Sequence, residues 1–292
     1  MRAFFLFDII FLMNEVNFLA EKIYSSYGAV KRARGCFLYT AKGVRLTDLY
    51  QEGGRSILGW GSEYSSAFRI FKNILSRGIT GSFDTFYSPL TTDKIGKKSQ
   101  LSKAVSSLLN SERSVFFCSS KQKALKTAVS VDSSSTFVYR PWNPEFINWA
   151  EVSCVIIEPP LSWATSLCIL AIKSDSPELE SKLLAIKDDC DLEKVPAPLC
   201  SAITRSIYDL ISALQNREEK DWFVYDKVLT KYWTRKGPYL FPKVPKDKYN
   251  DFIEHCLNCE IVISPIFVQP SIVPYKADFG VFKKLLNNPF LY

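Results

Sequence analysis

The sequence predicts an α/β protein, with a three-layer domain around a mostly parallel sheet and a small α+β domain at the C-terminus. Short apolar runs alternate with amphipathic helical segments through the middle of the chain, which is the pattern of parallel strands covered on both faces. Hydrophobic residues make up 47% of the 292 residues, enough for a sizeable core. After the polar run 215–221 the order changes to strands followed by helices.

The N-terminal part is expected to form a helix and a pair of strands. Residues 1–12 are apolar but too short to span a bilayer, and Asp8 interrupts them, so Met13 is the more natural start than Met1. The strands lie on either side of the Lys42-Gly43 turn. The helix and the two strands are expected at residues 14–30, 36–39 and 44–49.

The middle of the chain carries the alternating pattern. Gly78 is expected to end a helix that begins near Ser62, and residues 79–99 form a loop where a partner could sit. Pro177 and Pro198 each open a helix, since proline suits the first helical turn. Further helices are expected at residues 101–109 and 120–130, and strands at residues 114–117, 136–139, 153–157 and 167–172.

We place the domain boundaries at residues 1–30 for an N-terminal helical segment, 31–217 for the large domain and 218–292 for the small one. In the small domain, helical spacing predicts one helix around Phe252 and a last one around Phe282. Strands are expected at residues 222–229, 231–241 and 261–263.

Net charge and the pattern of cysteines limit the classes of protein to which the chain could belong. The net charge of +7 is spread among acids, which gives no dedicated nucleic-acid surface. The basic and aromatic stretch 231–249 leaves a nucleic-acid-binding protein as one alternative, although its prolines favour a folded domain. The eight cysteines lack regular spacing and several lie in apolar runs, which is typical of free thiols in the cytoplasm. No segment has the length of a membrane span.

Metal and nucleophile chemistry find little support. The one histidine, His255, precedes the pair Cys256 and Cys259, whose C-x-x-C spacing suggests zinc or redox chemistry. A second ligand pair is missing and Cys256 lies on the apolar face of a helix, so buried thiols are the favoured interpretation. We therefore expect no metal site.

Residues 43–61 (GVRLTDLYQEGGRSILGWG) are the most specific motif. They combine a turn, a short strand ending in Asp48 and a glycine-rich loop. This segment resembles the N-terminal signature of fold-type I, pyridoxal-phosphate-dependent aminotransferases of class III. Trp60 stands where that family usually has a histidine. The resemblance implies a three-layer α/β fold, a homodimer and, in active members, a cofactor bound to a lysine.

Weaker matches follow in order along the chain. Ser119 and Ser120 stand between a strand and a helix, where the family holds the cofactor phosphate, and Glu158-Pro159 resembles the end of a later strand. The glycine that lets a backbone approach phosphate is absent, so the two serines are either cofactor-binding residues or only a helix cap. Arg235 is a candidate, by residue type alone, for a substrate carboxylate.

The catalytic lysine is the missing part. The resemblance implies an aspartate strand and a lysine strand after Glu158, yet the segment at Pro198 that resembles the family beyond the lysine follows 40 residues later. Lys173, at the end of an apolar strand, is the candidate for a Schiff-base lysine, and the alternative is a solvated strand end.

The favoured function is therefore that of a degenerate aminotransferase-like protein with a ligand-binding or protein-interaction role, for which no cofactor is expected. The competing interpretation is an active transaminase that uses pyridoxal phosphate and Lys173. Whether the chain is an enzyme stays open between these two.

Overall fold

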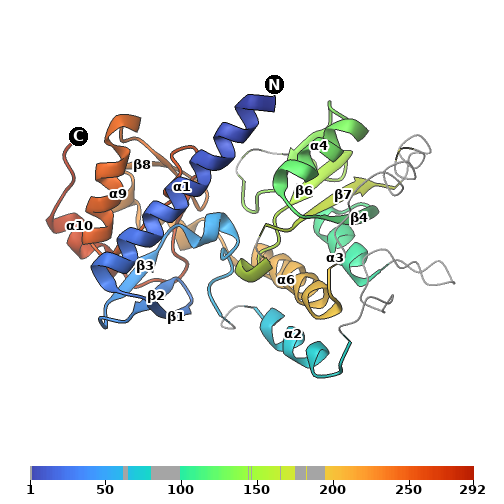
Figure 1. Cartoon of the computed structure of the whole chain (residues 1–292), viewed down its shortest axis with the longest axis horizontal. Coiled ribbons are helices and arrows are strands. Elements are labelled where there is room, and N and C mark those ends of the chain that lie inside the picture. The colour runs from blue at the N-terminus through green and yellow to red at the C-terminus, as the bar shows by residue number, and fades with distance from the viewer. Residues whose placement is uncertain are drawn as a thin grey trace. The chain divides into compact units, whose positions relative to one another are not determined.

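The computed structural model describes residues 2–61, 65–79, 99–143, 145, 147–164, 166–174, 182 and 195–292, and for residues 2–14 the backbone alone. The chain forms two compact units, one made of Met1–Glu63 with Arg217–Tyr292 and the other of Tyr64–Asn216 (Figure 1). Among the described helices, none combines the length and the apolar character that a membrane crossing needs. The expected loop 79–99 and the helix at Pro177 fall almost wholly outside the described residues.

The second unit is built on a four-stranded sheet with the order β4-β7-β6-β5. β7 runs antiparallel to both of its neighbours, whereas β5 pairs with β6 in parallel. Three strands therefore share one direction and one opposes them, so the described sheet is mixed, where the sequence predicted a mostly parallel one. The strands are β4 (Arg113–Cys118), β5 (Thr136–Val138), β6 (Cys154–Ile157) and β7 (Cys168–Lys173).

The direction of β7 follows from the length of its connection. Only residues 158–167 join β6 to β7, and a parallel crossover needs a dozen or more residues. So short a link permits only a reversal of strand direction. The link contains one turn of 3-10 helix, Ser162–Ala164.

Helices cover both sides of this sheet (Figure 1). Ala124 and Ala128 of α4 pack with Phe116, Ile156 and Leu170, which point to one face. Figure 1 shows α3 and α6 on the other side of the strands. Serine caps begin two of these helices: in α3 Ser99 accepts from the backbone N–H of Ser102, and in α4 Ser120 accepts from that of Lys123. The helices are α2 (Ala67–Leu75), α3 (Gln100–Leu109), α4 (Lys121–Val131) and α6 (Ala197–Asn216).

The first unit holds two small sheets. One has the order β1-β2-β3-β10, and β10 joins it in parallel through the pairs Ile261–Thr47 and Val262–Asp48. In the other, β8 and β9 form a hairpin within residues 231–241, where strand structure was expected, and β11 lies beside β9. The strands are β1 (Val30–Arg34), β2 (Phe37–Thr40), β3 (Arg45–Asp48), β8 (Trp233–Lys236), β9 (Tyr239–Pro242), β10 (Ile261–Val262) and β11 (Ser271–Ile272).

The pairing of β3 with β10 changes the division of the chain. The sequence grouped residues 31–63 with the large domain, whereas in the structure they form one unit with the C-terminal part. The polar run at 215–221, chosen as a boundary, coincides with the end of the second unit at Asn216.

One helical part of the first unit corrects a prediction from the sequence. Residues 222–229, expected as a strand, form two short helical turns. The buried side chains of Trp222, Tyr225 and Val228 recur every three residues, whereas Phe223 is exposed, and that period is helical. The helices are α1 (Arg2–Tyr27), α7 (Lys220–Phe223), α8 (Asp226–Leu229), α9 (Tyr249–Asn258) and α10 (Lys283–Asn287), with 3-10 turns at Gln51–Gly54, Lys246–Lys248 and Phe279–Phe282.

Candidate functional site

Lys173 is the last residue of β7, and the direction of β7 decides where it lies. Its partner across the strands is Arg113, the first residue of β4, while Cys168 pairs with Cys118, the last one. Ser119 and Ser120 follow Cys118 directly. The candidate lysine and the candidate phosphate-binding serines therefore lie at opposite ends of the strands of one sheet. We call these the two edges at which the strands begin and end. The length of β4 between them is about 17 Å at the usual rise per residue.

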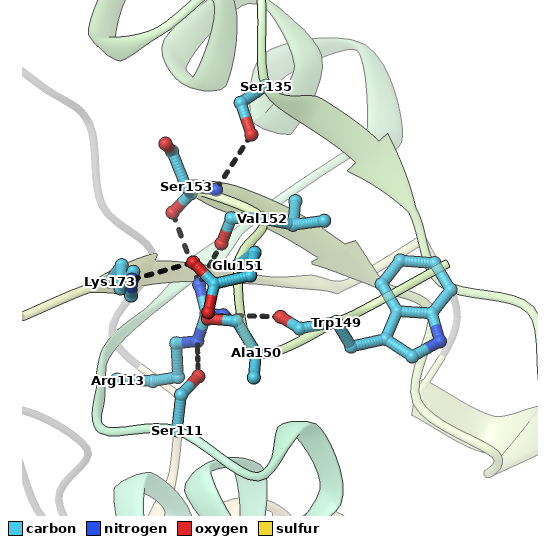
Figure 2. Close-up of polar contacts among 9 residues, drawn as sticks. All are labelled: Ser111, Arg113, Ser135, Trp149, Ala150, Glu151, Val152, Ser153 and Lys173. Carbon is cyan, nitrogen blue, oxygen red and sulfur yellow. Dashed lines mark hydrogen bonds and ion pairs between the residues drawn. The ribbon is translucent and has the colours of Figure 1, made fainter. Parts of the chain in front are cut away.

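Lys173 has an ion pair at its own edge. Its Nζ lies 3.6 Å from Oε2 of Glu151, in the loop that precedes β6. Figure 2 shows this pair beside the guanidinium of Arg113. Lys173 is thus a partly exposed cation that is paired with a carboxylate.

Arg113 organises this edge (Figure 2). Its side chain is fully buried. Nη1 donates to the carbonyl oxygen of Val152 at 2.5 Å, Nη2 to that of Trp149 at 2.6 Å, and Nε to Oγ of Ser111 at 2.8 Å. Longer contacts reach the carbonyl oxygens of Ala150 and Ser153. A guanidinium is suited to this because it presents five donors in a fixed plane. Arg113 thus fastens the loop 149–153 to the start of β4.

The opposite edge, where β4 and β6 end, carries the two serines. Ser120 is the N-cap of α4, and its Oγ accepts from the backbone N–H of Lys123 at 3.2 Å. Beside it, Nζ of Lys121 donates to Oε2 of Glu158 at 2.8 Å. Lys121 was not among the residues predicted from the sequence, although its position directly after the two serines was a signal for it.

This edge does not fit the phosphate of the cofactor that the resemblance implies. A bound phosphate would need the N–H groups at the start of α4, and the hydroxyl of Ser120 already occupies the one of Lys123. The Glu158 carboxylate lies at the same helix start, close enough to pair with Lys121, and it would repel an anion. Lys173 lies at the other edge, so these described residues do not bring a phosphate cradle and that amine together.

The motif that carried the resemblance lies in the first unit and is built around Asp48. This aspartate ends β3 and is 2% exposed. Its Oδ1 accepts from the backbone N–H groups of Tyr50 and Gln51, both at 2.9 Å, and its Oδ2 accepts from Nε1 of Trp60 at 2.7 Å. Burial raises the pKa of Asp48 to about 6. Trp60 therefore stands in the histidine position as a neutral hydrogen-bond donor to a buried carboxyl group.

Arg235 is engaged within the first unit. Its Nε and Nη2 donate to the two carboxylate oxygens of Asp226 at 2.6 and 2.9 Å, and Nη2 also pairs with Glu219 at 2.5 Å. These carboxylates raise its pKa further above the usual value. A substrate carboxylate would have to displace Asp226 and Glu219 from the guanidinium. Arg235 therefore has a structural role within the first unit.

The remaining sequence candidates have packed environments. Nε2 of His255 lies 2.8 Å from the carbonyl oxygen of Asn288 and 3.9 Å from Sγ of Cys259. Burial raises the pKa of both Cys256 and Cys259. Within the described residues, no cluster of three or more metal-ligating side chains occurs. In the stretch 231–249 the rings of Tyr232, Trp233 and Tyr239 are buried and therefore not presented for base stacking.

No family model matches the chain. It is 26% identical to an uncharacterised protein of Treponema pallidum (strain Nichols), over 87% of this chain and 91% of that protein. It is also 26% identical to an uncharacterised protein of Borreliella burgdorferi, over 90% of this chain and 92% of that one.

Solved structures share the fold at low identity. An ornithine aminotransferase from Plasmodium yoelii is 10% identical, with a TM-score of 0.61 over 94% of this chain and 97% of that chain. An acetylornithine aminotransferase from Elizabethkingia anophelis is 11% identical, with a TM-score of 0.62 over 91% and 98%. The ornithine aminotransferase from Toxoplasma gondii gives 10%, with a TM-score of 0.63 over 94% and 95%.

The chain has the aminotransferase fold. This agrees with the resemblance that residues 43–61 carried. At 10–11% identity the likeness defines the fold alone, and the chemistry has to be argued from the residues of this chain.

Proposed function

We propose that the chain is a non-catalytic protein that keeps the aminotransferase fold and uses it to bind a ligand or a protein partner. The observation that supports this most strongly is the direction of β7, which takes Lys173 to the edge opposite Ser119 and Ser120. A cofactor anchored by its phosphate at the start of α4 would lie about one strand length away. No lysine side chain spans that distance.

A second observation supports the same proposal. The resemblance implies an aspartate strand and a lysine strand after Glu158. In the described sheet, β6 is the direct neighbour of β7, and only residues 158–167 connect them. That link has no room for two further strands and their helices. We infer that the part of the domain that carries the chemistry in active members is missing at this place.

The amine at the serine edge does not restore the chemistry. Lys121 is held by Glu158 at 2.8 Å, and its side chain is 41% exposed. A Schiff base forms through a neutral amine, which a buried apolar site favours by lowering the pKa of a lysine. Lys121 has no such environment, because its side chain is exposed to solvent and engaged by the Glu158 carboxylate.

Chemical labelling tests the proposal. The full chain is mixed with an equimolar amount of pyridoxal phosphate, reduced with borohydride, and mapped by peptide mass spectrometry. We expect low labelling spread over exposed lysines, with Lys173 no more labelled than Lys103, an exposed residue of α3. Lys173→Ala and the matched control Lys103→Ala should then give the same total incorporation.

Stoichiometric labelling of one lysine would overturn the proposal. Label that Lys173→Ala removes would favour the active transaminase with Lys173, and label at Lys121 would indicate a different active site. The homodimer that the resemblance implies stays a prediction, which the molar mass in solution tests.

A further inference from the structure

The first unit contains a cavity of about 360 Å³ beneath α1. Val16, Leu19 and Ile23 of α1 form one wall, and Val30, Ala33 and Leu38 of the sheet form the other. The walls are therefore largely apolar. This volume is at the lower end of the range found for small-molecule sites.

The lining of the cavity also includes acidic and aromatic side chains. Asp48 and Glu52 line the cavity, together with Tyr50 and Trp60. The cavity thus combines apolar walls with two carboxyl groups and two aromatic side chains. All of these residues belong to the first unit.

Asp48 is the unusual member of this set. Its three hydrogen bonds come from neutral donors, the N–H groups of Tyr50, Gln51 and Trp60. Among the described residues, no lysine or arginine forms an ion pair with it. A buried carboxylate without a cation is costly, and a cationic partner would relieve that cost. Oδ2 accepts only one of these bonds, so it retains acceptor capacity.

The surrounding charges favour a positive ligand. The carboxylate of Glu52 raises the pKa of Asp48, although less than burial does. Burial also raises the pKa of Glu52 itself, and Arg55 opposes that shift. The aromatic side chains of Tyr50 and Trp60 also line the cavity.

We propose that this cavity binds a small organic cation with an apolar body, whose ammonium group pairs with Asp48 and whose hydrocarbon part lies along α1. The carboxylate supplies charge and orientation, and the apolar walls supply burial. The site lies wholly in the first unit and does not depend on the chemistry of Lys173.

Calorimetry with three six-carbon probes tests this. Hexylammonium, hexanol and hexanoate have the same apolar body and differ in charge. At pH 8, where Asp48 is ionised, we expect hexylammonium to bind the full chain at least about tenfold more tightly than hexanol, since a charge-assisted hydrogen bond is about twice as strong as a neutral one. Hexanoate should bind most weakly.

Acidity provides a second measurement on the unaltered protein. Asp48 takes up a proton below about pH 6, and hexylammonium stays charged at pH 5. The preference for hexylammonium over hexanol should therefore shrink several-fold between pH 8 and pH 5. Equal binding of the three probes, no binding of any, or a preference independent of pH would each overturn the proposal.

Variants locate the site. Asp48→Asn should remove the preference for the cation, while Asp251→Asn, an exposed carboxyl of α9, should leave it unchanged. If Asp48→Asn does not fold, Ala33→Phe, which fills the cavity from β1, should abolish binding of hexylammonium and hexanol alike. Lys173→Ala should keep hexylammonium binding intact, so a failure of this proposal is distinct from a failure of the proposed function. Unaltered binding in Ala33→Phe would contradict the location.

Discussion

At the scale of single residues, Asp48 makes the stability of the first unit depend on pH. Its pKa is about 6 in the folded chain, against 3.8 for the ordinary carboxyl group. Between these values the folded protein holds a proton that the unfolded chain has released. The free energy of unfolding should therefore fall as pH rises from about 4 to about 6 and stay lower above that range, by about 3 kcal/mol at most.

Urea denaturation across this pH range measures the effect. Other carboxyl groups titrate there too, so the informative quantity is the difference between the unaltered chain and Asp48→Asn. That difference should change between pH 4 and pH 6 and be flat above pH 7. Parallel curves would mean that Asp48 has an ordinary pKa.

Gly53 is a second residue whose identity the fold requires. Its φ is +66°, and a Cβ there would overlap the side-chain amide of Gln269, which donates to the Gly53 carbonyl oxygen at 3.0 Å. Gly43 has a similar φ of +79° but nothing within 4 Å of such a Cβ. Gly43→Ala should cost about 1 kcal/mol of stability from backbone strain alone. Gly53→Ala should cost more, about 2–3 kcal/mol, since the part-buried hydrogen bond from Gln269 is also lost.

Thermal or urea unfolding of the two variants gives the comparison. Gln269→Ala added to Gly53→Ala should recover part of the loss, because it removes the overlapping group. Equal destabilisation by the two glycine substitutions would show that the Gln269 contact has no energetic weight.

Residue identity alone predicted some of the site. The glycines and Asp48 in residues 43–61 carried the resemblance to class III aminotransferases, and that resemblance implied the fold. The partners could not be predicted in the same way. The hydrogen bond between Asp48 and Trp60 joins residues 12 positions apart in the sequence, and the one between Arg113 and Val152 joins residues 39 positions apart. Such contacts depend on how the strands pair.

At the scale of elements, Arg113 joins the start of β4 to the loop before β6. Its buried guanidinium donates to four backbone carbonyl oxygens and one hydroxyl group. Arg113→Lys keeps the charge but cannot reach all these acceptors. It should destabilise the protein by about 2–4 kcal/mol, since hydrogen bonds to charged groups are worth about 1.5–3 kcal/mol each.

Arg205→Lys is the matched control. Arg205 is 46% exposed and pairs with Asp209 one turn along α6, so its replacement should cost less than about 1 kcal/mol. Urea denaturation of both variants supplies the numbers. Similar costs for the two would contradict a clamping role for Arg113.

Elements were predictable where local signals were strong. The structure has helices close to the expected 101–109 and 120–130, with serine caps at both starts, because periodicity and capping are local. The error at residues 222–229 has a local cause too: several adjacent apolar residues fit both a strand and a short helix. The direction of β7 depends on the strands it pairs with. The local sequence around Lys173 therefore could not show at which edge of the sheet this residue lies.

At the scale of the whole molecule, the chain crosses between its two units twice. Tyr64–Asn216 is continuous in sequence and contains its own sheet and helices. Expressed alone, this fragment should fold, since a domain with its own core does so in principle. Near-ultraviolet circular dichroism and a single cooperative urea transition are the expected results. A fragment without cooperative unfolding would show that the second unit depends on the first.

The sequence did not reveal that the first unit is discontinuous. The parallel pairing of β3 with β10 joins residues more than 200 positions apart, and composition carries no trace of it. A polar run, residues 215–221, lies where the second unit ends at Asn216. The alternation of strands and helices predicted an α/β fold, and the likeness to solved aminotransferases agrees with that coarser statement. The mostly parallel sheet that the same pattern predicted is a mixed sheet in the described part of the second unit.

The visible absorption spectrum of the full chain with equimolar pyridoxal phosphate tests the central claim most directly. If Lys173 lies too far from the serine edge, the spectra of the unaltered protein and of Lys173→Ala should coincide, and both should match free cofactor with exposed amines. A visible aldimine band that is present in the unaltered protein and lost in Lys173→Ala would contradict the account.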